Sequence, residues 1–111
     1  MEFLLLIYEN EKRFSQGYDQ AEMSEYQAFG KEFAKNIKGG NALQPTGTAK
    51  TVRVRNGKSS RTDGPFAETK EQLGGYYLLE AKDISEAAKI AEKIPGARFG
   101  SVEVRPIMQF S

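Results

Sequence analysis

The side chains best suited to chemistry gather around residues 63 to 71, a polar stretch that leads into an apolar segment. Asp63 stands directly before Gly64-Pro65, a turn-forming sequence that can hold a carboxylate in a fixed position for acid or base catalysis. The same residue is also an ordinary turn residue, because an aspartate carboxylate readily accepts hydrogen bonds from nearby backbone amides. Both interpretations of Asp63 stay open from the sequence.

A second group of charged side chains follows within a few residues. Glu68, Lys70 and Glu71 fall within one helical turn if residues 67–73 are helical, and the two glutamates then form a pair that can share a proton or bind a cation. Solvated surface charges are the simpler explanation of the same pattern. We include all three residues among the candidate ligand-binding residues.

Three residues elsewhere in the chain can line a ligand-binding cleft together with Asp63 and the charged residues that follow it. Tyr8, Tyr76 and Arg105 offer phenol and guanidinium donors of the kind that bind an anionic small molecule. Against this interpretation, tyrosines are commonly core residues and an arginine near a strand end commonly forms an ion pair. The sequence therefore predicts a ligand-binding set of Tyr8, Asp63, Glu68, Lys70, Glu71, Tyr76 and Arg105, with Asp63 as the candidate catalytic residue.

The missing residue types narrow the chemistry. The chain has 0 His and 0 Cys, which excludes a Ser-His-Asp triad, thiolate catalysis, disulfides and zinc sites built from these ligands. Carboxylate, amine, phenol and guanidinium groups remain. We predict no cofactor and no dedicated metal site, although carboxylates can hold a hard cation.

A basic cluster offers an alternative function. Lys50, Arg53, Arg55, Lys58 and Arg61 have no acidic residue between them and lie on a predicted two-stranded ribbon, a shape that can enter a DNA groove. A formal net charge of +1 and the lack of interleaved aromatic residues argue against nucleic-acid binding. The alternative is therefore a regulatory or interaction module that acts through the basic hairpin 50–61.

The elements that must position these residues follow from apolar periodicity and turn signals. In the first half of the chain we predict a strand at residues 3–8, a helix from Asp19 and a connection at 41–50 that contains a short strand at 42–44. A hairpin of strands 51–55 and 58–62 follows. The last elements are a strand at about 75–81, a helix from Asp83 to Ile94 and a strand at 101–105. Each helix start has an acidic cap with a glutamate three residues later, and Asn56-Gly57 is a typical hairpin turn.

Two of these predictions concern side-chain orientation. Apolar residues of the first helix recur at steps of three and four and are predicted to face the sheet, while Glu22 is predicted to point outward. Gly39-Gly40 is predicted to end this helix. The stripe comprises Met23, Tyr26, Phe29 or Gly30, Phe33 and Ile37. In the hairpin, Val52 and Val54 share one face, which is predicted to be half-buried.

One domain at residues 1–111 accounts for the length, and the apolar run at 3–7 is too short to span a bilayer and lacks the features of a secretory signal. We expect a cytoplasmic protein without a membrane partner. Residues 3–8 and 76–79 are apolar on both sides, whereas helices can cover only one face of the sheet. The sequence therefore predicts an α+β, ferredoxin-like βαββαβ fold with an inserted hairpin, whose open sheet face pairs with a second copy in a homodimer.

The stretch Asp63-Gly64-Pro65-Phe66 and the residues that follow it to Ala81 resemble the signature of the DGPF family, a branch of the YCII-related proteins. The similarity extends from Phe3–Tyr8 to Val102–Met108. This resemblance implies a dimeric α+β barrel with a cleft beside each sheet. It also implies a link to sigma-factor-type transcription regulators, which fits a sensing role.

Some YCII-related proteins resemble enzymes that use a His-Asp pair for dehydrochlorination, elimination or isomerisation. Because this chain has no histidine, any catalysis must use Asp63, Glu68, Glu71 or Lys70. We expect a homodimer that binds a small polar or anionic metabolite near Asp63, with acid–base activity of isomerase or lyase type.

Overall fold

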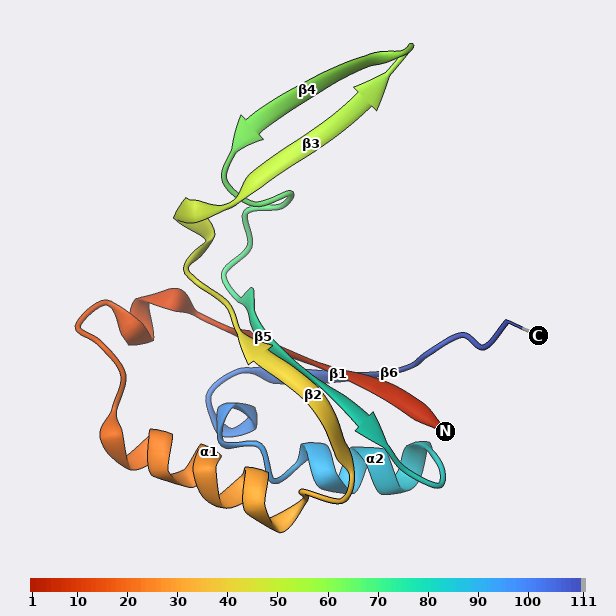
Figure 1. The fold of residues 1–111 in the computed structure, drawn as a ribbon. Helices are drawn as coiled ribbons and strands as arrows, with labels where there is room; N and C mark the ends of the chain where they lie inside the picture. Colours follow the sequence, from red (N-terminus) through yellow and green to blue (C-terminus); the bar gives the residue numbers. More distant parts are fainter. Residues whose placement is uncertain (111) are drawn as a thin grey trace.

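A computed structural model describes residues 1–110 (Figure 1). Six strands and two α-helices alternate in the order that a ferredoxin-like fold with an inserted hairpin requires. The elements are β1 (Glu2–Glu9), α1 (Gln20–Glu32), β2 (Ile37–Ala42), β3 (Lys50–Arg55), β4 (Lys58–Asp63), β5 (Gln72–Glu80), α2 (Ile84–Ala91) and β6 (Ser101–Pro106), with short 3-10 helices η1 (Glu11–Phe14), η2 (Thr46–Thr48) and η3 (Pro95–Arg98). The fold class predicted from the sequence is confirmed.

The main sheet has four antiparallel strands in the order β2-β5-β1-β6, so that the apolar strands β1 and β5 occupy its centre. Alternate residues of β1 are buried under the helices, and Phe3 and Leu5 are 0% exposed. Both helices lie on this face (Figure 1). Leu79 of β5 and Ile94 after α2 are the other large side chains that are fully buried.

Within residues 1–110, the opposite face of the sheet carries no α-helix (Figure 1). Register pairs Leu4 with Leu78 and Leu6 with Tyr76, so these side chains share the open face with Tyr8, and all five are partly exposed. The two-sided apolar character of β1 and β5 therefore leaves a half-buried apolar surface. We refer to this side of the sheet as the open face.

Helix α1 begins as predicted but ends earlier. The Asp19 carboxylate caps it by accepting a hydrogen bond from the Ala21 N–H at 2.9 Å. The predicted end at Gly39-Gly40 and the predicted strand at 42–44 are wrong, because the chain leaves the helix after Glu32 and forms β2 at Ile37–Ala42. Residues 37–42 pair with β5 instead of extending the helix, and the two glycines of this segment are unfavourable in a helix interior.

The orientation predicted for α1 is also partly wrong. Met23 is 50% exposed, whereas Glu22, which was predicted to point outward, is only 8% exposed. Glu22 is buried because Arg13 of η1 supplies a cation beside it. Phe29 faces the core as predicted and is 3% exposed.

Helix α2 is capped by Asp83, whose carboxylate accepts a hydrogen bond from the Glu86 N–H at 2.9 Å. It ends at Ala91, three residues before the predicted end at Ile94, and η3 follows. Ile94 is nevertheless 0% exposed, so its side chain packs in the core as predicted although it lies outside the helix. No helix in residues 1–110 is long and apolar enough to cross a membrane.

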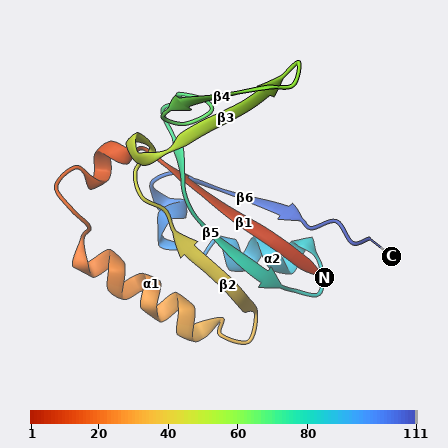
Figure 2. The ribbon, with the colours of Figure 1, turned by 45° about the horizontal axis from the view of Figure 1, so that its top comes forward.

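Strands β3 and β4 form a separate two-stranded sheet, which we call the hairpin arm (Lys50–Asp63). Asn56 and Gly57 have φ angles of +53° and +75°, which confirms the predicted turn. The arm projects from the side of the sheet opposite the helices (Figures 1 and 2). Val52 and Val54 are 58% and 60% exposed within residues 1–110, so the predicted half-buried face is wrong for the single chain.

Candidate functional site

Two adjoining pockets, both shallow and wide open to solvent, lie where β1 ends and β5 and β6 begin. The first, which we call the loop cavity, has a volume of about 660 Å³. Its lining residues are Asn10, Glu11, Lys12, Thr46, Gly47, Gly64, Pro65, Glu68, Thr69, Lys70 and Gln72. The second, the sheet-face cavity, has a volume of about 470 Å³ and is lined by Tyr8, Thr69, Glu71, Ser101, Val102 and Glu103. Thr69 lines both, so the cavities are neighbours.

Hydrogen bonds between side chains and backbone hold the walls of the loop cavity. Glu11 accepts hydrogen bonds from the Thr46 N–H at 2.7 Å and the Thr46 hydroxyl at 2.8 Å, which ties η2 to η1. Gly64 has a φ of +97°, a conformation that favours glycine, and its N–H donates to the Ala49 carbonyl at 2.7 Å. The Thr51 hydroxyl donates to the Gly64 carbonyl at 2.8 Å. The Gly64-Pro65 turn is therefore fixed at the base of the hairpin arm.

Three charged side chains in the loop cavity are available to a ligand. Lys12 and Lys70 bring two amines and Glu68 brings a carboxylate, and all three residues are exposed. Within residues 1–110, none of the three takes part in an ion pair. Glu11, by contrast, is occupied by Thr46. The loop cavity thus offers two cations that can hold an acidic group and one carboxylate that can exchange a proton.

The sheet-face cavity is acidic. The Ser101 hydroxyl donates a hydrogen bond to Glu71 Oε1 at 3.0 Å, which orients that carboxylate beside Tyr8. Glu103 forms an ion pair with Arg105, whose Nε donates to Glu103 Oε2 at 2.6 Å. Arg105 is not part of the cavity lining. The lining therefore holds two carboxylates and no cationic side chain.

The structure separates the predicted site residues into distinct groups. Glu68 and Lys70 line the loop cavity, and Tyr8 and Glu71 line the sheet-face cavity. The helix considered for residues 67–73 is not formed, because this segment bends and enters β5 at Gln72, so the two glutamates do not form a pair. Gln72 fixes the bend by donating to the carbonyls of Ala67 and Thr69, both at 3.1 Å.

The other predicted residues lie outside both cavities. Asp63 ends β4 and forms an ion pair with Lys50, which stands opposite it in the register, and its side chain is 83% exposed. Tyr76 lies on the open face, where its hydroxyl accepts a hydrogen bond from Asn41 Nδ2 at 3.1 Å. The catalytic role of Asp63 stays a prediction. Its neighbour Gly64 does line the loop cavity.

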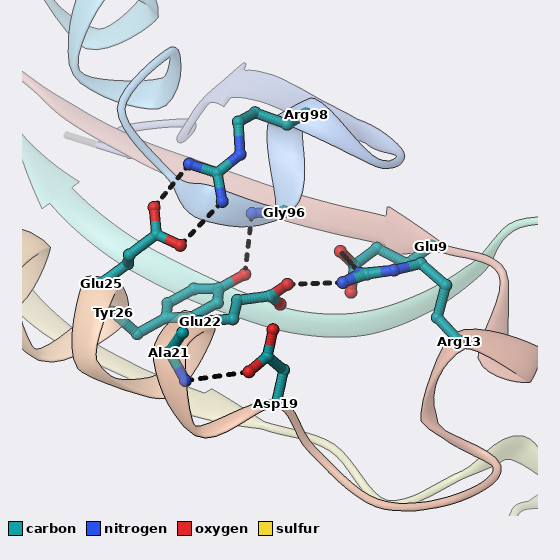
Figure 3. A network of polar contacts seen from close by, with 9 residues as sticks. All are labelled: Glu9, Arg13, Asp19, Ala21, Glu22, Glu25, Tyr26, Gly96 and Arg98. Atoms are coloured by element: carbon teal, nitrogen blue, oxygen red, sulfur yellow. Dashed lines mark hydrogen bonds and ion pairs between the residues drawn. The ribbon is translucent and has the colours of Figure 1, made fainter.

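A buried ionic network on the helix side was not predicted (Figure 3). Glu9 and Glu22 are 7% and 8% exposed, and Arg13 bridges them with N···O distances of 3.3 and 2.5 Å. Burial raises the pKa of Glu9, and the nearby charges of Glu22 and Glu71 act in the same direction, while Arg13 lowers it. A signal was present in the sequence, since Glu9 continues the alternation of buried residues in β1.

Aromatic and polar contacts surround this network. The Arg13 guanidinium lies 3.8 Å from the ring centroid of Phe99 and 4.9 Å from that of Phe14. The Tyr26 hydroxyl accepts a hydrogen bond from the Gly96 N–H at 3.2 Å (Figure 3), and burial raises the pKa of Tyr26. The network joins η1, α1 and η3 at the end of β1. It therefore fixes the segment that carries Tyr8 and Glu11 into the two cavities.

Residues 1–110 contain no group of three or more acidic side chains placed to hold a metal ion. The candidate site is instead a pair of polar cavities at one end of the main sheet. The fold is that of a ferredoxin-like α+β protein, and the open face of its sheet lies beside the candidate site. The chain belongs to the family of the YCII-related domain, whose family model matches residues 1–111. This confirms the family resemblance seen in the sequence.

Two similar proteins place the family in context. An uncharacterized protein of Rhizobium meliloti (strain 1021), R00369, is 36% identical over 114 residues, which cover 96% of this chain and 92% of that protein. The solved structure of 5-chloro-2-hydroxyhydroquinone dehydrochlorinase (TftG) from Burkholderia phenoliruptrix AC1100, in complex with 2,5-dihydroxybenzoquinone, is similar with a TM-score of 0.59 and 16% identity. The match covers 99% of this chain and 96% of that chain. At this identity the likeness shows the fold.

Proposed function

We propose that the protein is a homodimer that binds a small acidic metabolite in the loop cavity beside Asp63 and carries out acid–base chemistry of lyase or isomerase type there. The observation that carries the proposal is the meeting of Lys12, Lys70 and Glu68 in one cavity next to the Gly64-Pro65 turn. Two amines can bind the acidic group of the ligand, and the unpaired carboxylate can accept a proton. The cytoplasmic location expected from the sequence stays a prediction.

The fold and its open face support the dimer. Leu4, Leu6 and Leu78 form a partly exposed apolar surface on one side of the sheet, and packing against a second sheet is the ordinary way to cover such a surface. The similarity to a dehydrochlorinase solved with 2,5-dihydroxybenzoquinone supports a small oxygenated ring as a first probe. Our proposal gives the acid–base role to Glu68 because this residue lines the cavity and takes part in no ion pair within residues 1–110, and gives Asp63 the role of fixing the turn through Lys50.

Titration calorimetry with 2,5-dihydroxybenzoquinone tests the binding step. We expect Lys70→Gln and Lys12→Gln each to raise the Kd by about 10-fold or more, because a charge-assisted hydrogen bond contributes ~1.5–3 kcal/mol. Lys31→Gln is the matched control, since Lys31 is an exposed lysine of α1 outside the cavity. No heat of binding to the wild type, or an equal loss in the control, would overturn the proposed site.

Exchange of the ring C–H protons of the same probe for deuterium, followed by proton NMR, tests the acid–base step. We expect the wild type to accelerate this exchange and Glu68→Gln to abolish the acceleration while it retains binding. Asp63→Ala distinguishes the two roles of that residue. Loss of exchange with intact folding and binding would assign the proton transfer to Asp63, whereas a lower melting temperature with retained exchange supports its structural role.

A further inference from the structure

The hairpin arm has two unlike faces. Strand register pairs Val52 with Arg61 and Val54 with Ser59, so the two valines and Arg61 share one face, which we call the valine face. The other face is partly covered within the chain, because Thr51 and Arg53 are half-buried and the Arg53 guanidinium lies 5.7 Å from the ring centroid of Phe66. The valine face has no such cover, since its two valines are 58% and 60% exposed.

An uncovered arm of this kind is physically unfavourable. A two-stranded hairpin is at best marginally stable in water when nothing packs against it. The arm also makes the single chain extended, because the radius of gyration is 15.9 Å, whereas a compact domain of this length has ~13 Å. The valine face therefore needs a partner surface that accepts two apolar side chains and one cation.

The sheet-face cavity has the complementary character. Its lining residues include Glu71, Glu103 and the apolar Val102, and no lining residue is cationic. Arg61 is exposed and takes part in no ion pair within residues 1–110. Glu103 already pairs with Arg105, but Glu71 takes part in no ion pair within residues 1–110, so the Glu71 carboxylate and the unpaired Arg61 would each gain from contact with the other.

The position of the arm shows which molecule can make this contact. The arm and the helices lie on opposite sides of the sheet, and the arm extends over the side of the open face (Figure 2). A second copy packed on the open face would lie next to the arm. We infer that the hairpin arm docks on that second copy through its valine face and places Arg61 beside Glu71 and Glu103 of the second copy, so that each sheet-face cavity is completed by the arm of the other chain.

This inference rests on the homodimer of the proposed function, and a charge exchange between two variants tests it. Arg61→Glu makes the arm acidic at its contact point, and Glu71→Arg makes the cavity basic. Each homodimer then brings like charges together at both contacts, whereas the mixed dimer brings opposite charges together at both. We expect native mass spectrometry of the mixture to show the mixed dimer well above the share of about one half that random pairing gives.

Two controls separate specific contact from general attraction. Arg55→Glu changes the charge by the same amount on the opposite face of the arm, and its mixture with Glu71→Arg should stay near the random share. Val52→Thr with Val54→Thr keeps the β-branched shape but removes apolar surface. We expect this variant to raise the dimer dissociation constant by about 10-fold in sedimentation experiments.

The outcomes also distinguish this inference from the proposal on which it rests. A monomeric wild type would overturn both the homodimer and the docked arm. A dimeric wild type with random mixing of the charge variants and an unchanged dissociation constant for the valine variant would overturn the docked arm alone. Binding of a DNA duplex that Arg61→Glu and Arg55→Glu weaken equally, with an unchanged dimer, would also overturn it and would assign the arm to polyanion binding.

Discussion

Replacement of Arg13 by methionine tests the buried ionic network most directly. The change leaves the carboxylates of Glu9 and Glu22, which are 7% and 8% exposed, without the cation that bridges them. Removing one partner of a buried ion pair costs about 3–5 kcal/mol, and we expect the lower end because the Arg13 side chain is 25% exposed. A loss of about 3 kcal/mol lowers the Tm by roughly 10 °C or more in a domain of this size.

Urea unfolding followed by circular dichroism measures this loss, since the chain has no tryptophan to report on unfolding. Lys12→Met is the matched control, because Lys12 lies in the same 3-10 helix and is exposed. We expect the control to change the free energy of unfolding by less than about 0.5 kcal/mol. Arg13→Met combined with Glu9→Gln and Glu22→Gln should recover most of the lost stability, because no unpaired charge then remains buried.

The pH dependence gives a second test of the same network. Burial raises the pKa of Glu9 in the folded protein. A carboxyl group whose pKa is higher in the folded than in the unfolded protein stabilises the fold at pH values below its unfolded-state pKa. This stabilisation is lost as the pH rises through the folded-state pKa. Removal of the Arg13 cation raises the Glu9 pKa further, so we expect the deficit of Arg13→Met to be smaller at pH 5 than at pH 7. A deficit that does not change with pH, or one as small as that of the Lys12 control, would refute the reasoning.

Two further substitutions test how the end of β1 is held. Tyr26→Phe removes the acceptor of the Gly96 N–H, and we expect a loss of about 1 kcal/mol in unfolding free energy, whereas no change in urea unfolding would show that water replaces the hydroxyl. Gly100→Ala would place a Cβ 2.0 Å from the Tyr8 carbonyl oxygen, so β6 must shift. We expect the free energy of unfolding to fall by about 1–3 kcal/mol or more, and 2,5-dihydroxybenzoquinone to bind more weakly. Gly74→Ala is the control, because its Cβ would meet only the Ile7 carbonyl at 4.0 Å, and equal losses in the two variants would contradict the argument.

Local signals in the sequence determined much of the fold. The caps Asp19 and Asp83 predicted the starts of both α-helices, because a carboxylate can satisfy the free N–H groups of a first turn. Asn56-Gly57 predicted the hairpin arm, since both residues adopt a positive φ. The apolar runs predicted the central strands. Each of these features depends on a few neighbouring residues, and the ferredoxin-like order follows from their succession.

Tertiary pairing decided what the local pattern left ambiguous. The helical periodicity of α1 continues to Ile37, yet that residue belongs to β2, because Leu79 of β5 stands opposite it in the sheet. Glu68 and Glu71 fit one helical turn in sequence, but the chain places them in different cavities. Only long-range contacts distinguish these alternatives, since local periodicity allows both.

The candidate site shows the same division. The sequence determined which chemical groups are present, because the absence of histidine and cysteine leaves carboxylates, amines, phenols and guanidinium groups. It also indicated the Asp63-Gly64-Pro65 turn beside the loop cavity. Only the tertiary structure placed Lys12 and Lys70 in the lining of one cavity and buried Glu9 beside Arg13. Both arrangements depend on how the end of β1 packs against segments that are distant in the chain. Burial and mutual distance set the charge balance of the site, and neither is a property of residue type alone.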